Sequence, residues 1–136
     1  MREPDRILRE AERTLDFSQP IGLMMLGILG NVTDYGEAKG ITKRLFAALA
    51  PGSYVVISHA TAEGEPVPTA KVSDLYTKVS QPLVPRSRSD LLHLLEGWEL
   101  VEPGLSRGAD WRPDPGDPPT VDVGRLATLA AVARKP

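Results

Sequence analysis

Two nearly continuous apolar runs, separated by an amphipathic segment, dominate the first half of the chain. The runs are Ile21–Leu29 and Tyr54–Ser58, and neither alternates with polar residues. Between them, Glu37–Leu49 places its apolar residues at helical spacing. Strands without polar alternation are typical of parallel sheets that helices cover on both faces. The pattern therefore predicts a β-α-β unit with Met24 and Met25 in the core.

Helical spacing recurs on either side of this unit. Asp5–Leu15 and Thr69–Ser80 each carry one apolar stripe, and both are predicted to be helices. A third, shorter helix is predicted at Leu91–Glu96, because Ser87 and Asp90 resemble the capping box that begins a helix.

Two further segments near the carboxyl terminus are predicted to be strands. Trp98–Glu102 alternates as a strand does, whereas the many alanines of Arg125–Ala133 also suit a helix. The place of Arg125–Ala133 in the pattern favours a strand. With no helix between them, these two strands should pair antiparallel.

The expected fold class is α/β, with two parallel strands, a terminal antiparallel hairpin and flanking helices. At 136 residues the chain has the length of one domain, taken as 1–136. Of its 13 prolines, several fall in residues 103–120, which we expect to be a loop.

Charge and composition narrow the functional classes. The net charge of -2 argues against a nucleic-acid partner or an anionic membrane surface. Cysteine is absent, which excludes thiolate metal sites and cysteine nucleophiles, and no metal-spaced histidine cluster occurs. The first residues carry both charge signs rather than a signal-peptide pattern, so a cytoplasmic location is expected.

Small and polar residues follow the first apolar run, at the edge where open parallel sheets bind ligands. These residues are candidates for a cofactor wall, and they are Gly27, Leu29, Gly30 and Asn31, with Asp34 just beyond. The same residue types are also the usual ones in a tight turn from strand to helix. Both interpretations stay open from the sequence.

Four further residues are candidates for the substrate side of such a site: Ser58, His59, Tyr76 and Trp111. His59 could act as a base or orient a substrate, or it could be a hydrogen-bonded residue at a strand end. Arg86 and Arg88 beside two serines could bind an anion, but a solvated helix start is the simpler interpretation. His93, among leucines, is expected to be structural.

The order of these segments resembles the second half of a class I S-adenosylmethionine-dependent methyltransferase. More narrowly, it is similar to a bacterial family of S-adenosyl methyltransferase-like proteins with poorly defined substrates. The segments that carry the resemblance are Arg2–Leu8, Asp16–Pro20, Leu49–Thr61, Arg86–Ser89, Leu100–Leu105 and Trp111–Pro113. Together they extend over nearly the whole chain.

The resemblance implies a partial Rossmann-like methyltransferase sheet with S-adenosylmethionine as cofactor of the complete fold. Together with the hairpin-like ending, it implies that Arg125–Ala133 inserts between Tyr54–Ser58 and Trp98–Glu102. The glycine-rich loop that holds the cofactor, and the acidic residue that holds its ribose, belong to the missing amino-terminal half. Family members tend to have histidine where this chain has Gly30. The resemblance therefore implies a methyltransferase half that is inactive alone and binds the cofactor weakly or not at all.

Two other functions compete with this one. The chain could be a non-catalytic interaction module, or half of a split enzyme, that pairs through an exposed Ile21–Leu29 edge. Its partner would be a complementary amino-terminal half or a second copy. In that case, Met25→Lys should raise the monomer fraction if the Met25 side chain faces the open flank.

An unrelated small hydrolase is the other rival function, although no G-x-S-x-G or P-loop motif supports it.

Overall fold

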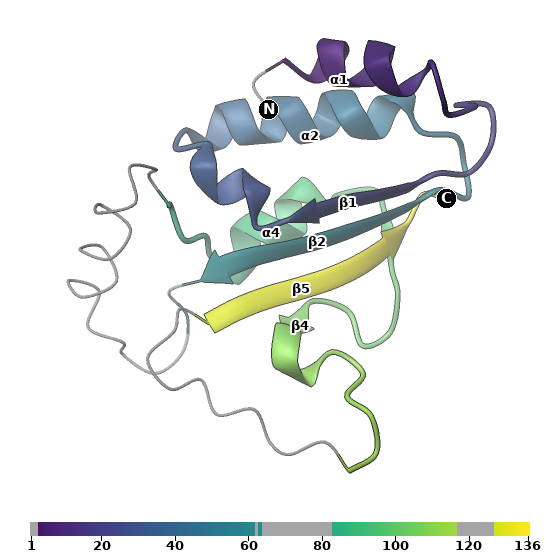
Figure 1. Ribbon diagram of the computed structural model, residues 1–136. Coiled ribbons are helices and arrows are strands. Elements are labelled where there is room, and N and C mark those ends of the chain that lie inside the picture. Colours follow the sequence, from purple (N-terminus) through teal and green to yellow (C-terminus); the bar gives the residue numbers. More distant parts are fainter. Residues whose placement is uncertain (1–2, 62, 64–82, 117–126) are drawn as a thin grey trace.

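The computed structural model describes residues 3–61, 63, 83–116 and 127–136. The expected helix Thr69–Ser80, with the candidate Tyr76, lies outside these residues. Within them, three helices and one five-stranded sheet form a mixed α/β fold, which confirms the expected fold class (Figure 1).

The sheet has the strand order β1-β2-β5-β3, with β4 pairing separately with β5. β1 and β2 are parallel, whereas β5 is antiparallel to β2, β3 and β4. The predicted insertion of the last strand between the second and third is therefore confirmed. The strands are β1 Gly22–Leu26, β2 Tyr54–Thr61, β3 Glu99–Leu100, β4 Ser106–Arg107 and β5 Ala127–Arg134.

The three helices are α1 Pro4–Ala11, α2 Tyr35–Ala48 and α4 Arg88–Leu94. The beginnings of α2 and α4 follow from local capping. The Asp34 carboxylate accepts a hydrogen bond of 2.6 Å from the Glu37 amide at the start of α2. Ser87 and Asp90 form the predicted capping box at the start of α4.

The helices cover only one face of the sheet. Val55, Ile57 and Met25 are buried in a core that also takes residues from α2 and α4. On the alternate positions of β1, Met24 and Leu26 are 61% and 51% exposed. In Figure 1, α1 lies along α2, α4 lies behind the strands, and no helix crosses in front of β1 and β2.

The exposure of Met24 corrects two predictions. Both methionines were expected in the core, but only Met25, at 1% exposure, is there. Alternation along a strand sends neighbouring side chains to opposite faces, and here one face has no helix among the described residues. A lysine at position 25 would consequently disrupt the core, so Met24 is the position that tests self-association.

β1 forms an edge of the sheet. Among the described residues it pairs only with β2. The Ile21 carbonyl and the Gly27 amide both bond to β2, so alternate residues turn toward that neighbour. By the same alternation, the backbone groups of Gly22, Met24 and Leu26 point to the open side.

The segment 103–120, expected to be a loop, includes two short elements. β4 is followed at once by a 3-10 turn, η2 Gly108–Asp110, and residues 117–120 lie outside the described part. Within the described ranges, no helix is long and apolar enough to cross a membrane.

Candidate functional site

The candidate site lies where β1 and β2 end side by side. β1 stops at Leu26, earlier than expected, because Gly27 adopts a left-handed backbone with φ of 70° that turns the chain away. The Gly27 amide still donates to the Ser58 carbonyl at 2.9 Å. The chain then winds into a 3-10 turn, η1 Ile28–Asn31, in place of the expected last residues of the strand.

The four predicted cofactor-wall residues divide into two kinds. Leu29 and Gly30 are buried, so their side-chain positions face the protein. Gly27 and Asn31 are exposed, and a Cβ at Gly27 would meet nothing within 4 Å. The open part of the wall is therefore Gly27 and Asn31.

Gly30 has a structural reason to be glycine in this chain. A Cβ at this position would lie 2.4 Å from Leu83 Cδ1 and 3.9 Å from His59 Cε1. The Gly30 carbonyl also accepts a hydrogen bond of 2.9 Å from the Val84 amide. The side chain of Leu83 thus occupies the space that a larger residue at position 30 would need.

Arg86 connects the ends of the two strands. It is 4% exposed, and its guanidinium donates to the Leu29 carbonyl at 2.7 Å and to the Val32 carbonyl at 2.6 Å. The same guanidinium lies 2.8 Å from Nε2 of His59. The backbone amide of Arg86 donates to the Ala60 carbonyl. One buried cation therefore fixes η1, at the end of β1, to the end of β2.

This arrangement corrects the interpretation of Arg86 as a solvated residue at a helix start. Arg86 does precede α4, but it occupies the position directly before the N-cap Ser87. A hydrophobic residue at that position often packs against the first turn of the helix. That placement is the one signal in the sequence that could have indicated burial.

His59 is held by both of its ring nitrogens. Nδ1 lies 2.7 Å from the Ala60 carbonyl, which can only accept, so Nδ1 carries the proton and Nε2 accepts from Arg86. Burial lowers the pKa of His59 below its ordinary 6.5, and the charge of Arg86 lowers that pKa further. With its lone pair engaged and 1% of its surface exposed, His59 acts here as a structural acceptor.

The remaining candidate residues have fewer contacts with the strand-end site, or none. Ser58 is half-buried and joins the site through its carbonyl bond to Gly27. Trp111 follows η2, and the Arg112 guanidinium lies 5.1 Å from its ring. Its indole N–H is buried and has no hydrogen-bond partner among the described residues. His93, expected to be structural, is exposed on α4. Across the described ranges, no group of three or more metal-ligating side chains gathers.

The neutral state of His59 predicts a dependence of stability on pH. Because the folded pKa lies below 6.5, the unfolded chain binds more protons between the two values. The free energy of unfolding should therefore fall as the pH drops below about 6.5. Urea unfolding across this range should show the fall in the parent chain and a much flatter profile in His59→Gln.

His93→Gln is the matched control, since it removes the other histidine of the chain. It should keep the parent profile. A pH dependence that survives in His59→Gln and disappears in His93→Gln would contradict the assignment.

The sheet order, with two parallel strands followed by an antiparallel insertion, is that of the carboxyl-terminal part of a methyltransferase fold. The chain belongs to the S-adenosyl methyltransferase family, whose sequence pattern it matches over residues 1–136. Comparison with curated proteins found no match.

Two solved structures are similar over nearly the whole chain. A DUF574 family protein from Streptomyces avermitilis is 36% identical with a TM-score of 0.84, and the match covers 99% of this chain and 52% of that one. A protein from Thermobifida fusca described as a putative methyltransferase is 30% identical with a TM-score of 0.83, covering 98% and 51%. This chain therefore spans about half the length of these relatives.

A more distant structure shares only the fold. The N-methyltransferase NodS from Bradyrhizobium japonicum, solved with S-adenosyl-L-homocysteine, is 15% identical with a TM-score of 0.51, and the match covers 97% of this chain and 61% of that one.

Proposed function

We propose that this chain supplies the carboxyl-terminal half of an S-adenosylmethionine-dependent methyltransferase and needs a complementary amino-terminal half to bind the cofactor. The observation that carries the proposal is the open side of β1. Among the described residues, the backbone groups on this side of β1 have no partner strand. Met24 and Leu26 of the same strand, which ends next to Gly27, are exposed. The relatives have about twice the length, which leaves room for such a half.

In this proposal the chain provides one wall of the cofactor site. Gly27 leaves open space beside the backbone, and Asn31 offers an exposed amide next to it. When bound, S-adenosylmethionine supplies an electrophilic methyl group. The residues of this chain hold the wall in place, because Arg86 fixes the carbonyls of Leu29 and Val32.

His59 has no role as a base in this proposal. Its Nε2 lone pair accepts from Arg86, and its ring is buried. Methyl transfer to a good nucleophile depends first on proximity and alignment, which a rigid wall provides. The methyl acceptor would be positioned by residues beyond those that form the wall.

The isolated chain should bind S-adenosylmethionine more weakly than about 10 μM, roughly 7 kcal/mol of binding free energy. The reason is that Gly27 and Asn31 supply too few directional contacts for tight binding. Isothermal titration of the purified chain measures this. Affinity tighter than that value would show a complete site and contradict the need for a second half.

The complementary experiment fuses the amino-terminal half of the Streptomyces avermitilis relative ahead of this chain. The fusion should bind S-adenosylmethionine at least about tenfold more tightly than the chain alone, a gain of about 1.4 kcal/mol. A fusion that is folded by circular dichroism but gains no affinity would contradict the proposal.

A homodimer that pairs two β1 edges is the second candidate, and it places the chain among interaction modules. Exposed apolar residues on β1 and on the adjoining Tyr54 favour it. The fusion separates the two candidates, since a supplied half should compete with self-association.

A further inference from the structure

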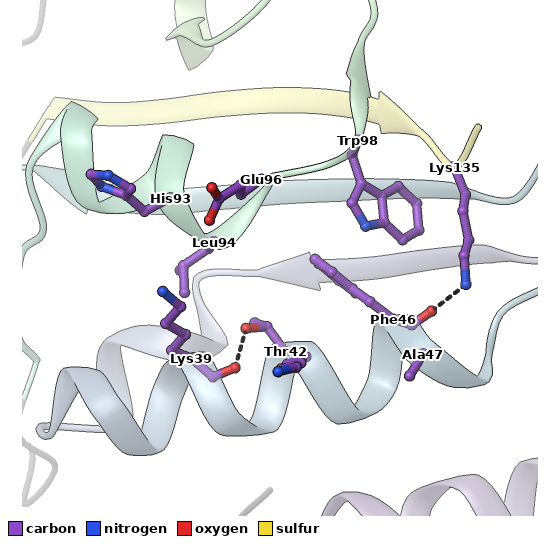
Figure 2. A pocket seen from close by; sticks show the side chains of 10 residues that line it. Lys39, Thr42, Phe46, Ala47, His93, Leu94, Glu96, Trp98 and Lys135 are labelled. Carbon is purple, nitrogen blue, oxygen red and sulfur yellow. Dashed lines mark hydrogen bonds between the residues drawn. The ribbon is translucent and has the colours of Figure 1, made fainter.

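A second concave site lies between α2 and α4, and it shares no residue with the strand-end site. Its volume is about 430 Å³, within the range of small-molecule pockets. Figure 2 shows its floor, where the rings of Phe46 and Trp98 lie next to each other, to the right of Leu94. The two ring centroids are 4.7 Å apart and the planes are tilted by 52°. The floor is therefore aromatic and apolar, with its two rings facing different directions.

Positive charge surrounds this floor. Lys39 and Lys43 line the pocket from α2, and within the described part of the chain neither forms an ion pair or a hydrogen bond through its ammonium group. Lys135 lies at the other end, where its Nζ donates to the carbonyls of Phe46 at 2.9 Å and Leu49 at 2.7 Å. The lining includes one carboxylate, Glu96, against these three ammonium groups.

We propose that this pocket binds a small planar organic anion, namely an aromatic carboxylate. The planar body would stack on the half-buried ring of Trp98, because Phe46 is 6% exposed and its ring is tilted away by 52°. The carboxylate would pair with the ammonium groups of Lys39 and Lys43, which have no acidic partner among the described residues.

The proposal is independent of the methyltransferase function, because it rests on the helical side of the molecule alone. It would account for the lysines on two adjacent turns of α2 that have no acidic partner among the described residues. Arg6 and Arg13 on and after α1, by contrast, each lie beside a glutamate at 3.5 Å and 3.0 Å.

The test titrates isotope-labelled protein with naphthalenecarboxylate and follows the two indole N–H signals by NMR. Trp98→Phe assigns them. The Trp98 signal should shift and saturate, whereas the Trp111 signal should stay. Lys39→Ala combined with Lys43→Ala should weaken binding at least about fivefold, and so should replacing the probe with neutral naphthalenemethanol.

Arg6→Ala combined with Arg13→Ala is the matched control, since it removes the same number of exposed cations from another part of the surface. It should leave the affinity unchanged. The proposal is overturned if the Trp98 signal does not saturate, if the neutral probe binds equally well, or if the lysine variant binds like the control.

Discussion

Replacing Arg86 with methionine should destabilise the folded chain by about 3 kcal/mol or more. The substitution leaves the Val32 carbonyl and Nε2 of His59 without a donor, and the Leu29 carbonyl keeps only its bond from the Val32 amide. Each buried acceptor that loses its partner costs about 1–3 kcal/mol. Since a whole domain is stable by only about 5–15 kcal/mol, the loss should be visible in a urea titration at neutral pH.

Arg44→Met is the matched control for this loss. Arg44 forms an ion pair with Asp5 at 2.6 Å, but the two side chains are 52% and 57% exposed. A pair of this kind contributes less than about 1 kcal/mol. Equal losses for the two variants would show that Arg86 is an ordinary surface cation.

Arg86→Lys tests the geometry separately from the charge. Lysine keeps the positive charge but lacks the planar group that reaches three acceptors at once. We expect this variant to lose stability and to exchange the amides of Leu29–Val32 faster, because η1 is no longer fixed. Full rescue by lysine would mean that charge alone accounts for the effect.

The second large effect concerns the open side of the sheet. The isolated chain should self-associate, and Met24→Lys should weaken that association about tenfold. Met24 is 61% exposed on β1 and shares its face with Leu26 and, across the register, Tyr54. Burying one large apolar side chain is worth about 1.5–3 kcal/mol, of which about 1.4 kcal/mol already gives a tenfold change. Sedimentation velocity across a concentration series measures the change.

Leu92→Lys is the control for this substitution, because Leu92 is 40% exposed on α4, in the helical layer. It should leave the association unchanged. A parent chain that stays monomeric at high concentration, or a Leu92 variant that acts like the Met24 variant, would contradict the role of the β1 flank.

The parallel pair and the antiparallel ending could be predicted from the sequence because their signals are local, whereas the insertion of β5 between β2 and β3 was predicted from the hairpin-like ending and the family resemblance. Continuous apolar runs indicated the parallel pair, and the absence of a helix between the last two strands indicated antiparallel pairing. The capping box at Ser87 and Asp90 indicated a helix here, but the helix was predicted from Leu91 and begins three residues earlier, at Arg88. The end of β1 was placed too late, since an apolar Ile28 and Leu29 continue the pattern while the backbone of Gly27 already turns away.

The arrangement at the candidate site depended on contacts that no local pattern contains. Arg86 and His59 are 27 residues apart, and their contact exists only once β2 and the segment before α4 come together. Met24 was misplaced for a related reason: an apolar run does not reveal that one face of the sheet has no covering helix among the described residues. The close approach of Leu83 to Gly30 could not be predicted from the sequence either.

The central claim is that the ends of β1 and β2 form half of a cofactor site. The most direct measurement titrates S-adenosyl-L-homocysteine into the labelled fusion and maps the amide signals that shift. We expect the amide signals of Gly27–Asn31 and Ser58–Thr61 to shift and the indole signal of Trp98 to stay unchanged. Saturable shifts confined to the pocket between α2 and α4, with none at the strand ends, would contradict it.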